Sequence, residues 1–253
     1  DVFTEEEAKE LRAELEAAEE KWPDAFKGAA RNNGHLNIIC LDEIIHNPII
    51  LDAIEDLIGA DILNYGTVLF IKEPNDSGFV SWHQDAKYMG LEPHIGITAW
   101  VALTEANDDN GCMQMIPASH GEIRDHNDTF DKENILTRGQ KVENVDASMA
   151  VSTALLPGQM SIHSARAIHS SQPNRSNDRR IGFAIQSYIP PHVKQIITPT
   201  GAKLVRGSDS FGNFEHLPRP KSDMEPSNIK TRDWVNETWS KILYHGAKMR
   251  RDF

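Results

Sequence analysis

The pattern of apolar and polar positions along this chain changes near residue 62. The residues before it are rich in Ala, Leu, Ile, Glu and Lys and carry helix start signals. Thr4 and Glu7 form a capping-box pattern, which predicts a helix over 5–22. Asn47 and Pro48 open a second predicted helix, which we expect to end at Gly59.

Beyond residue 62, short apolar runs of strand length lie between clusters of Gly, Pro, Asn and Asp. These runs cover 67–72, 96–103, 112–116, 159–163 and 181–189. No amphipathic helix separates them, so we expect an antiparallel β core rather than alternating β and α units. The polar stretch 122–150 shows little periodicity, which predicts a long loop that is either a substrate lid or a disordered insertion.

A last helix is expected over 231–244, with Trp234 and Trp239 on its apolar side. The whole pattern predicts a mainly β fold with flanking helices in a single domain over 1–253. Its expected parts are a helical region over about 1–60, a β core over about 62–190 and a helical extension over about 225–245.

Composition narrows the class of protein. The 253 residues are 39% hydrophobic and 25% charged, which is ordinary for a globular domain. A net charge of -12 argues against nucleic acid or an anionic membrane as a partner. Cys40 and Cys112 have no metal-ligand spacing, which favours free thiols in a reducing compartment. No apolar run approaches the ~20 residues of a membrane span, and we expect a cytoplasmic protein of undefined oligomeric state.

His83 and Asp85 are the first residues that suggest chemistry. In a strand, side chains two positions apart share a face, so this pair would offer one nitrogen and one oxygen to a metal. A histidine from a distant strand would complete a set of two histidines and one carboxylate. Such a set leaves three positions open and serves Fe(II). Alone, the pair is also common by chance as two solvated side chains.

A second segment strengthens this interpretation. His169 precedes a turn, and Arg180 begins the next apolar strand. If the two strands pair across the turn, Arg180 returns close to His169. Its guanidinium would then suit the far carboxylate of a dicarboxylic acid whose other end chelates the iron. His163 is a competing third ligand, and Arg179 is a competing cation that would face the opposite side of the strand.

Several segments, in order, resemble the phytanoyl-CoA dioxygenase family of Fe(II)/2-oxoglutarate oxygenases, most densely over 62–190. They are Ile71-Lys72-Glu73-Pro74, Trp82-His83-Gln84-Asp85-Ala86-Lys87-Tyr88, Thr98-Ala99-Trp100-Val101-Ala102-Leu103, Asn110-Gly111-Cys112-Met113, Ile116-Pro117-Ala118-Ser119-His120, and His169-Ser170-Ser171-Gln172-Pro173-Asn174 with Arg180.

The resemblance implies a double-stranded β-helix (a jelly-roll, cupin-like core) that uses Fe(II), 2-oxoglutarate and O2. It assigns the iron to His83, Asp85 and His169. His169 is preferred over His163 because only His169 is followed by the family's Ser-x-Pro-Asn pattern and by Arg180 at the matching distance. The residues that it assigns to the 2-oxoglutarate pocket are Arg180, Ser171, Trp100, Thr98 and Gln84.

The implied activity is hydroxylation of an unactivated C–H bond of a small metabolite. An aminophosphonate, an amino acid and a secondary metabolite are the candidate substrates. Halogenating relatives replace the metal carboxylate by a small residue, so the presence of Asp85 favours hydroxylation. The candidate substrate contacts, for each of which an exposed or structural role is the alternative, are Lys87, Tyr88, His163, Arg31 and His35.

Two other functions use the same residues. A cupin-like metal-binding protein or isomerase would share the barrel without oxygen chemistry. Two histidines and a carboxylate also suit the zinc ion of a hydrolase. A hydrolase, however, has no use for the dicarboxylate clamp that Ser171 and Arg180 would form.

Overall fold

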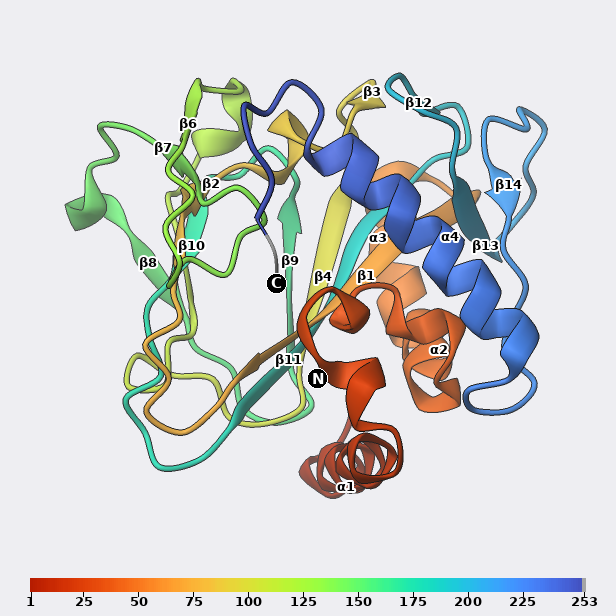
Figure 1. Ribbon diagram of the computed structural model, residues 1–253, viewed down its shortest axis with the longest axis horizontal. Coiled ribbons are helices and arrows are strands. Elements are labelled where there is room, and N and C mark those ends of the chain that lie inside the picture. The colour runs from red at the N-terminus through yellow and green to blue at the C-terminus, as the bar shows by residue number, and fades with distance from the viewer. Residues whose placement is uncertain (252–253) are drawn as a thin grey trace.

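Two facing β-sheets form the centre of the molecule, and the first three helices pack against the outer face of the larger sheet (Figure 1). The computed structural model describes residues 1–251. The helices are α1 (Glu5–Lys21), α2 (Ile39–Ile45), α3 (Pro48–Ile58) and α4 (Pro226–Leu243). The strands are β1 (Ile62–Lys72), β2 (Val80–His83), β3 (Leu91–Glu92), β4 (Ile97–Ala102), β5 (Met113–Met115), β6 (His126–Asp128), β7 (Gln140–Val142), β8 (Val151–Thr153), β9 (Met160–Ser164), β10 (His169–Ser171), β11 (Arg180–Ile189), β12 (Lys194–Gln195), β13 (Gly201–Arg206) and β14 (Glu215–His216).

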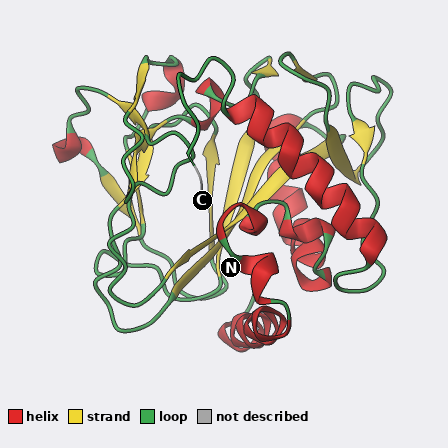
Figure 2. Cartoon of the chain, viewed as in Figure 1, coloured by secondary structure: helices red, strands yellow, loops and turns green. Residues whose placement is uncertain are grey.

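The larger sheet has the order β14-β13-β1-β11-β4-β9, and the smaller one has the order β2-β10-β5-β8. The strand pairs within them are antiparallel except for β13 with β14. This arrangement is a jelly roll, and it confirms the predicted fold class. Figure 2 shows the helices gathered beside the larger sheet, while loops surround the smaller one.

Alternation along the central strands β1, β4 and β11 separates the core from the interior between the sheets. One face of each strand joins α1, α2 and α3 in the largest apolar cluster. The strand residues in that cluster include Leu69, Ile71, Ala99, Val101, Ile181, Phe183 and Ile185. The other face turns toward the smaller sheet and carries Phe70, Thr98, Trp100, Arg180, Ala184 and Gln186. The polar members of this second set are therefore fixed by the strands that build the core.

Helix α1 begins at the predicted capping box, in which Thr4 accepts from the Glu7 N–H and Glu7 accepts from the Thr4 N–H. Helix α3 begins at Pro48 behind the Asn47 cap and ends before Gly59, as predicted. Each helix buries apolar side chains against the larger sheet, among them Leu15 and Ile54. Burying a side chain of this size contributes roughly 1.5–3 kcal/mol.

Helix α4 crosses in front of β1 (Figure 1) and starts at Pro226, five residues before the predicted position. The Trp239 ring stacks on Tyr65 with 5.3 Å between centroids. Trp239 is 4% exposed, whereas Trp234 is 37% exposed. The prediction that both tryptophans face the core was wrong, because five residues rotate a helix position by roughly 140°.

The stretch 122–150 contains more structure than predicted. Strands β6 and β7 pair with each other, and Ala147–Met149 forms a 3-10 turn. The Ser81 hydroxyl donates to the Gln140 carbonyl, which ties this region to β2. The expectation of a wholly irregular loop was therefore wrong, and its role as a lid stays a prediction. Helix α2 and strand β13 were not predicted from the sequence.

Two further sequence expectations concern the whole chain. Cys40 and Cys112 are both buried and free, as expected. Within residues 1–251, no helix combines the length and apolarity needed to cross a membrane.

Substitution of Gly66 tests how closely α4 packs against β1. A Cβ at this position would lie 2.1 Å from the Trp239 ring and 2.6 Å from the Asn33 Oδ1. Gly66→Ala should therefore lower the free energy of unfolding by roughly 1–3 kcal/mol through overpacking, measured by urea denaturation. Gly121→Ala, where a Cβ meets nothing within 4 Å, is the control. Equal stability of the two variants would show that α4 is not packed this tightly.

Candidate metal and cosubstrate site

His83, Asp85 and His169 come together between the two sheets. One ligand atom from each lies within 4.8 Å of the other two, which makes them a candidate metal-binding group within the described chain. His83 ends β2 and His169 begins β10, and the two residues pair directly in the smaller sheet. The three side chains are at least nine-tenths buried. The structure thus brings together the three residues that the sequence suggested, and His163 is not in this group.

The local backbone at the pair differs from the expectation. Strand β2 stops at His83, and Asp85 opens a 3-10 turn, Asp85–Lys87. The two side chains still converge, with 3.4 Å between the His83 Nε2 and the Asp85 Oδ1. The chain leaves the strand immediately after His83, so the turn rather than the pleat places Asp85.

Backbone carbonyls fix the histidine tautomers. The His83 Nδ1 lies 2.9 Å from the Ser81 oxygen and 3.1 Å from the His169 oxygen. The His169 Nδ1 lies 3.0 Å from the Ala167 oxygen. A proton on each Nδ1 satisfies these contacts and leaves each Nε2 with a free lone pair. This is the arrangement that a metal site requires of its histidines.

The charge states also suit a divalent cation. Burial and the nearby His83 lower the pKa of His169 to about 3. Burial raises the pKa of Asp85, but the adjacent His83, when it is protonated, outweighs burial and lowers this pKa below its usual range. Gln186 donates to the Asp85 Oδ1 over 3.2 Å and helps to orient it. A carboxylate and two imidazole rings therefore face one point.

Arg180 is the second feature of this interior. It is 2% exposed, forms no ion pair with any residue of 1–251, and its Nε has no hydrogen-bond partner. Its guanidinium lies 5.3 Å from the centre of the Trp100 ring. Burial lowers its pKa to about 10, which leaves it charged near neutrality. A buried cation without a counter-ion is the chemical signature of an anion-binding site.

Lys72 brings a second basic side chain to the same end of the interior. Its ammonium donates to the Ser171 hydroxyl and to the Gln172 carbonyl, and it is 1% exposed. Burial and the charge of Arg180 lower the pKa of Lys72 to about 6. Ser171 in turn donates to the Gly111 carbonyl over 2.9 Å. Sequence reasoning missed Lys72, although a lone lysine in the apolar run 67–72 was a usable signal.

The route by which Arg180 approaches His169 differs from the one expected. Strands β10 and β11 do not pair across the turn, because β10 belongs to the smaller sheet and β11 to the larger. Both residues line one small cavity of about 50 Å³. They meet because the sheets face each other. Arg179 points outward to Glu16, Glu19 and Glu73, as the alternation requires.

Gln84 does not face this cavity, which corrects the expectation that it contacts the cosubstrate. Its amide donates to the Glu122 and Arg166 carbonyls and accepts from the Arg124 N–H. Its backbone N–H donates to the His126 Nε2 over 2.9 Å. Gln84 therefore fastens the stretch after residue 121 to the segment that carries His83 and Asp85.

Thr98, Trp100 and His163 line the small cavity with the triad. Burial lowers the pKa of His163 to about 4. Within residues 1–251 neither of its ring nitrogens has a hydrogen-bond partner, so both remain available to a ligand in this cavity. Trp100 lies against Gly182, where a Cβ would fall 1.7 Å from the indole ring. Only glycine at 182 leaves room for Trp100 in this position.

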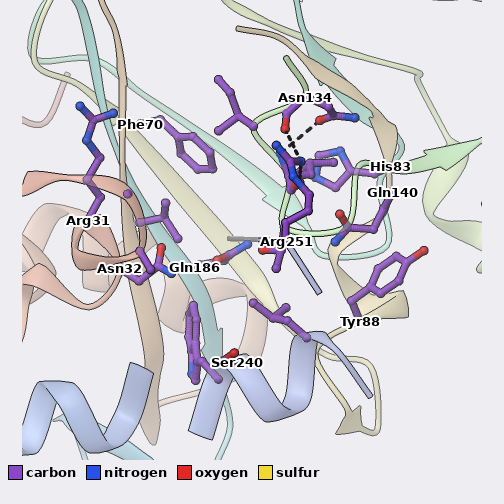
Figure 3. A pocket seen from close by; sticks show the side chains of 18 of the residues that line it. Arg31, Asn32, Phe70, His83, Tyr88, Asn134, Gln140, Gln186, Ser240 and Arg251 are labelled. Carbon is purple, nitrogen blue, oxygen red and sulfur yellow. Dashed lines mark hydrogen bonds between the residues drawn. The ribbon is translucent and has the colours of Figure 1, made fainter. Parts of the chain in front are cut away.

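A larger cavity of about 680 Å³ opens on the other side of the triad, and Figure 3 shows it from close by. His83, Asp85 and Gln186 line both cavities. In the figure, Arg31 and His83 lie on opposite sides, with Gln186 between them. Arg31 is half-buried, and its guanidinium donates to the Phe26 and Ile71 carbonyls. It is therefore held against the cavity rather than solvated in a loop.

The end of the described chain helps to enclose this larger cavity. The Arg251 guanidinium donates to the Asn134 carbonyl over 2.9 Å and to the Leu136 carbonyl over 3.1 Å (Figure 3). Tyr244 donates to the Thr137 carbonyl. Residues 132–137 are consequently bridged to the segment that follows α4, and both segments line the cavity.

The remaining predicted substrate contacts lie differently. Tyr88 lines the large cavity and a neighbouring pocket, whereas Lys87 lines only the neighbouring one and is paired with Asp125. His35 is fully buried, and its Nδ1 lies 2.9 Å from the Thr67 hydroxyl. His35 lines neither cavity, so its role is structural. It is neither a substrate contact nor a residue of a solvated loop.

These residues fit iron and 2-oxoglutarate. The triad offers two imidazole nitrogens and a carboxylate, the donor set of non-haem Fe(II) sites. Arg180, with Ser171 and Lys72 behind it, offers an unpaired positive charge in the same small cavity. A dicarboxylic acid with a keto group could bind the metal at one end of this cavity and place its second carboxylate against Arg180 at the other.

Comparisons with known proteins agree with this fit. A sequence model described as phytanoyl-CoA dioxygenase (PhyH) matches residues 1–182. A solved structure titled "non-heme monooxygenase; ThoJ apo" has a TM-score of 0.84 and 31% identity, and the match covers 95% of this chain and 90% of that one. A structure titled "CytC3 with Fe(II) and alpha-ketoglutarate" has a TM-score of 0.62 and 25% identity, with 88% and 89% covered.

A curated relative from Stutzerimonas stutzeri is named "Probable alpha-ketoglutarate-dependent hypophosphite dioxygenase". It is 28% identical over 195 residues, which are 73% of this chain and 62% of that protein. The "Phytanoyl-CoA dioxygenase domain-containing protein 1 homolog" of Caenorhabditis elegans is 25% identical over 126 residues, 47% of this chain and 44% of that protein. The chain thus spans less than two thirds of the length of these curated relatives.

Lys72→Met tests whether the buried ammonium group of Lys72 lacks a compensating negative charge. The pKa of Lys72 falls from 10.5 to about 6 in the folded chain, so the unfolded chain binds more protons between these values. The stability of the parent protein should therefore rise with pH across this window. The methionine variant should lack that rise and should be more stable by roughly 1–4 kcal/mol near pH 6.

Urea denaturation at pH 6 and pH 9 measures this difference. Lys194→Met, at an exposed position on β12, is the control and should keep the pH dependence of the parent. A Lys72→Met protein that is less stable than the parent at pH 6 would contradict a buried, uncompensated lysine.

Proposed function

The chain belongs to the phytanoyl-CoA dioxygenase family, and from this we propose that it is an Fe(II)- and 2-oxoglutarate-dependent dioxygenase that hydroxylates a small metabolite. One observation carries the proposal: the buried triad and the unpaired guanidinium of Arg180 share one cavity. A metal site alone serves many reactions. A metal site with a dicarboxylate anchor beside it is specific to a cosubstrate such as 2-oxoglutarate.

Each residue has a defined part in this proposal. His83, Asp85 and His169 would hold the metal through three ligand atoms on one side. Arg180 and Ser171 would hold the carboxylate at the far end of 2-oxoglutarate, with the Trp100 ring as a wall. When bound, iron and 2-oxoglutarate would together activate O2, the oxidant for C–H hydroxylation, with 2-oxoglutarate converted to succinate and CO2.

The larger cavity is the proposed substrate site. Its walls include Phe70, Leu136 and Trp239, which exclude water from the space beside the triad. Gln186 orients Asp85 and at the same time faces this cavity, so it borders both metal and substrate. The substrate's reacting C–H bond is positioned by this wall rather than by the cosubstrate pocket.

Arg31 and Tyr88 are the proposed polar contacts for the substrate, and His163 faces the cosubstrate cavity instead. A half-buried guanidinium suits a phosphonate or a carboxylate group. The name of the Stutzerimonas stutzeri relative refers to hypophosphite, which supports a phosphorus oxyanion among the candidates. A small aminophosphonate, an amino acid and a secondary metabolite remain the proposed substrate classes.

Two alternatives are less well supported. A cupin-like binding protein or isomerase would not need a buried guanidinium without a counter-ion next to the metal ligands. A zinc hydrolase would share the triad but would have no use for that cation. The retained carboxylate of Asp85 supports hydroxylation over halogenation, because it occupies the position that a halide would need.

Substitution of Asp85 is the direct test. Asp85→Ala should lower substrate-dependent succinate formation by at least about 100-fold, because the metal loses its one anionic ligand. Succinate is measured after anaerobic loading with Fe(II) and addition of O2, with a library of phosphonates, amino acids and related acids. His169→Ala should behave alike.

His46→Ala is the matched control, since His46 is a half-buried histidine on the far side of the larger sheet and lines neither cavity. Normal turnover by Asp85→Ala would contradict the ligand assignment. A parent protein that forms no succinate with any 2-oxoglutarate loading would contradict the proposed function itself.

A further inference from the structure

Two polar side chains of the small cavity have no partner. Thr98 is 2% exposed and His163 is 7% exposed. Within the described chain, neither the Thr98 hydroxyl nor either ring nitrogen of His163 has a hydrogen-bond partner. Leaving buried polar groups unpaired is unfavourable, and native proteins rarely do so. Such groups are expected where a ligand completes the hydrogen bonding.

The two residues form a pair. Strands β4 and β9 are antiparallel, and Thr98 lies directly opposite His163 in their register. Opposed residues in antiparallel strands project side by side on the same face. Both side chains line the small cavity that also contains the triad and Arg180. One molecule in that cavity can therefore reach both of them.

The register also shows which end of the cavity this pair occupies. Trp100 lies opposite Ala184, and Thr98 comes two residues earlier on β4, beside the stretch of β11 that contains Gln186. Gln186 binds Asp85. The ring centres of His163 and His169 are 4.8 Å apart. Thr98 and His163 consequently lie at the metal end, whereas Arg180 begins β11 at the opposite end.

The chemistry of the pair matches a 2-oxo acid. A neutral imidazole offers one N–H donor, and the threonine hydroxyl offers a second donor. A carboxylate and an adjacent keto oxygen accept such hydrogen bonds. Two donors side by side therefore suit the end of 2-oxoglutarate that faces the metal.

We propose that Thr98 and His163 bind the 2-oxo acid end of 2-oxoglutarate, opposite the end held by Arg180 and Ser171. This inference rests on the proposed function, since it presupposes that 2-oxoglutarate enters the small cavity. It makes both residues positioning groups that orient the cosubstrate at the metal. His163 itself is not one of the three metal-binding residues.

Binding of 2-oxoglutarate to the Ni(II)-loaded protein, measured by calorimetric titration, tests the proposal without turnover. Thr98→Val keeps the shape of the side chain and removes its hydroxyl, and His163→Phe removes both ring nitrogens. Each should weaken 2-oxoglutarate binding by roughly 2- to 12-fold, the effect of one lost hydrogen bond. Thr98→Ser keeps the hydroxyl and should retain the parent affinity. The affinity for Ni(II) should not change in any of the three.

Thr200→Val is the matched control. Thr200 is also a 2% exposed threonine whose hydroxyl has no partner, but it lines neither cavity. Both valine variants should unfold at the same or a higher urea concentration than the parent, because each removes an unpaired buried hydroxyl. Only Thr98→Val should also lose affinity for 2-oxoglutarate. A purely structural role for Thr98 predicts the opposite combination, with lower stability and unchanged affinity.

Three results would overturn the inference, and they are distinguishable. Parent affinity in both Thr98→Val and His163→Phe would show that the pair does not contact the cosubstrate. An equal loss of Ni(II) affinity would show that the pair acts through the metal ligands. A parent protein that binds Ni(II) but no 2-oxoglutarate would refute the proposed function on which the inference rests.

Discussion

Alternation of side chains along three strands fixes both the core and the site of this protein. β1, β4 and β11 each send one set of side chains to the helices and the other set into the space between the sheets. The apolar set supplies the largest core cluster, so the strands cannot slip without exposing it. That register holds the opposite set in place, including Trp100, Arg180 and Gln186. The same strand register therefore stabilises the core and sets the geometry of the site.

The site itself contains polar and basic groups whose burial disfavours folding when no ligand is bound. Arg180 and Lys72 place two basic groups at one buried end without a carboxylate partner in the described chain, and Thr98 and His163 are unpaired at the other end. The triad between them combines one carboxylate with two imidazole rings. Such an interior is complementary to a divalent cation and a dicarboxylate. Ligand binding would offset the unfavourable burial, which links the stability of the protein to occupancy of its site.

Much of this could be predicted from the sequence because it depends on local signals. The caps of α1 and α3, the apolar runs of the strands and the spacing from His169 to Arg180 are all local patterns. What could not be predicted depends on contacts between distant segments. The turn that carries Asp85, the outward amide of Gln84 and the register of Thr98 with His163 are set by neighbours far along the chain. Arg180 reaches His169 across two sheets, a route that no local pattern specifies.

We infer that metal and 2-oxoglutarate occupy one composite site. Anaerobic equilibrium dialysis of the full chain with labelled 2-oxoglutarate, with and without Fe(II), measures this most directly. We expect one equivalent of 2-oxoglutarate to bind per chain, with an affinity that rises at least about 10-fold when one equivalent of Fe(II) is present, because the metal and Arg180 each hold one end. Binding that is absent, or that is unaffected by Fe(II), would contradict it.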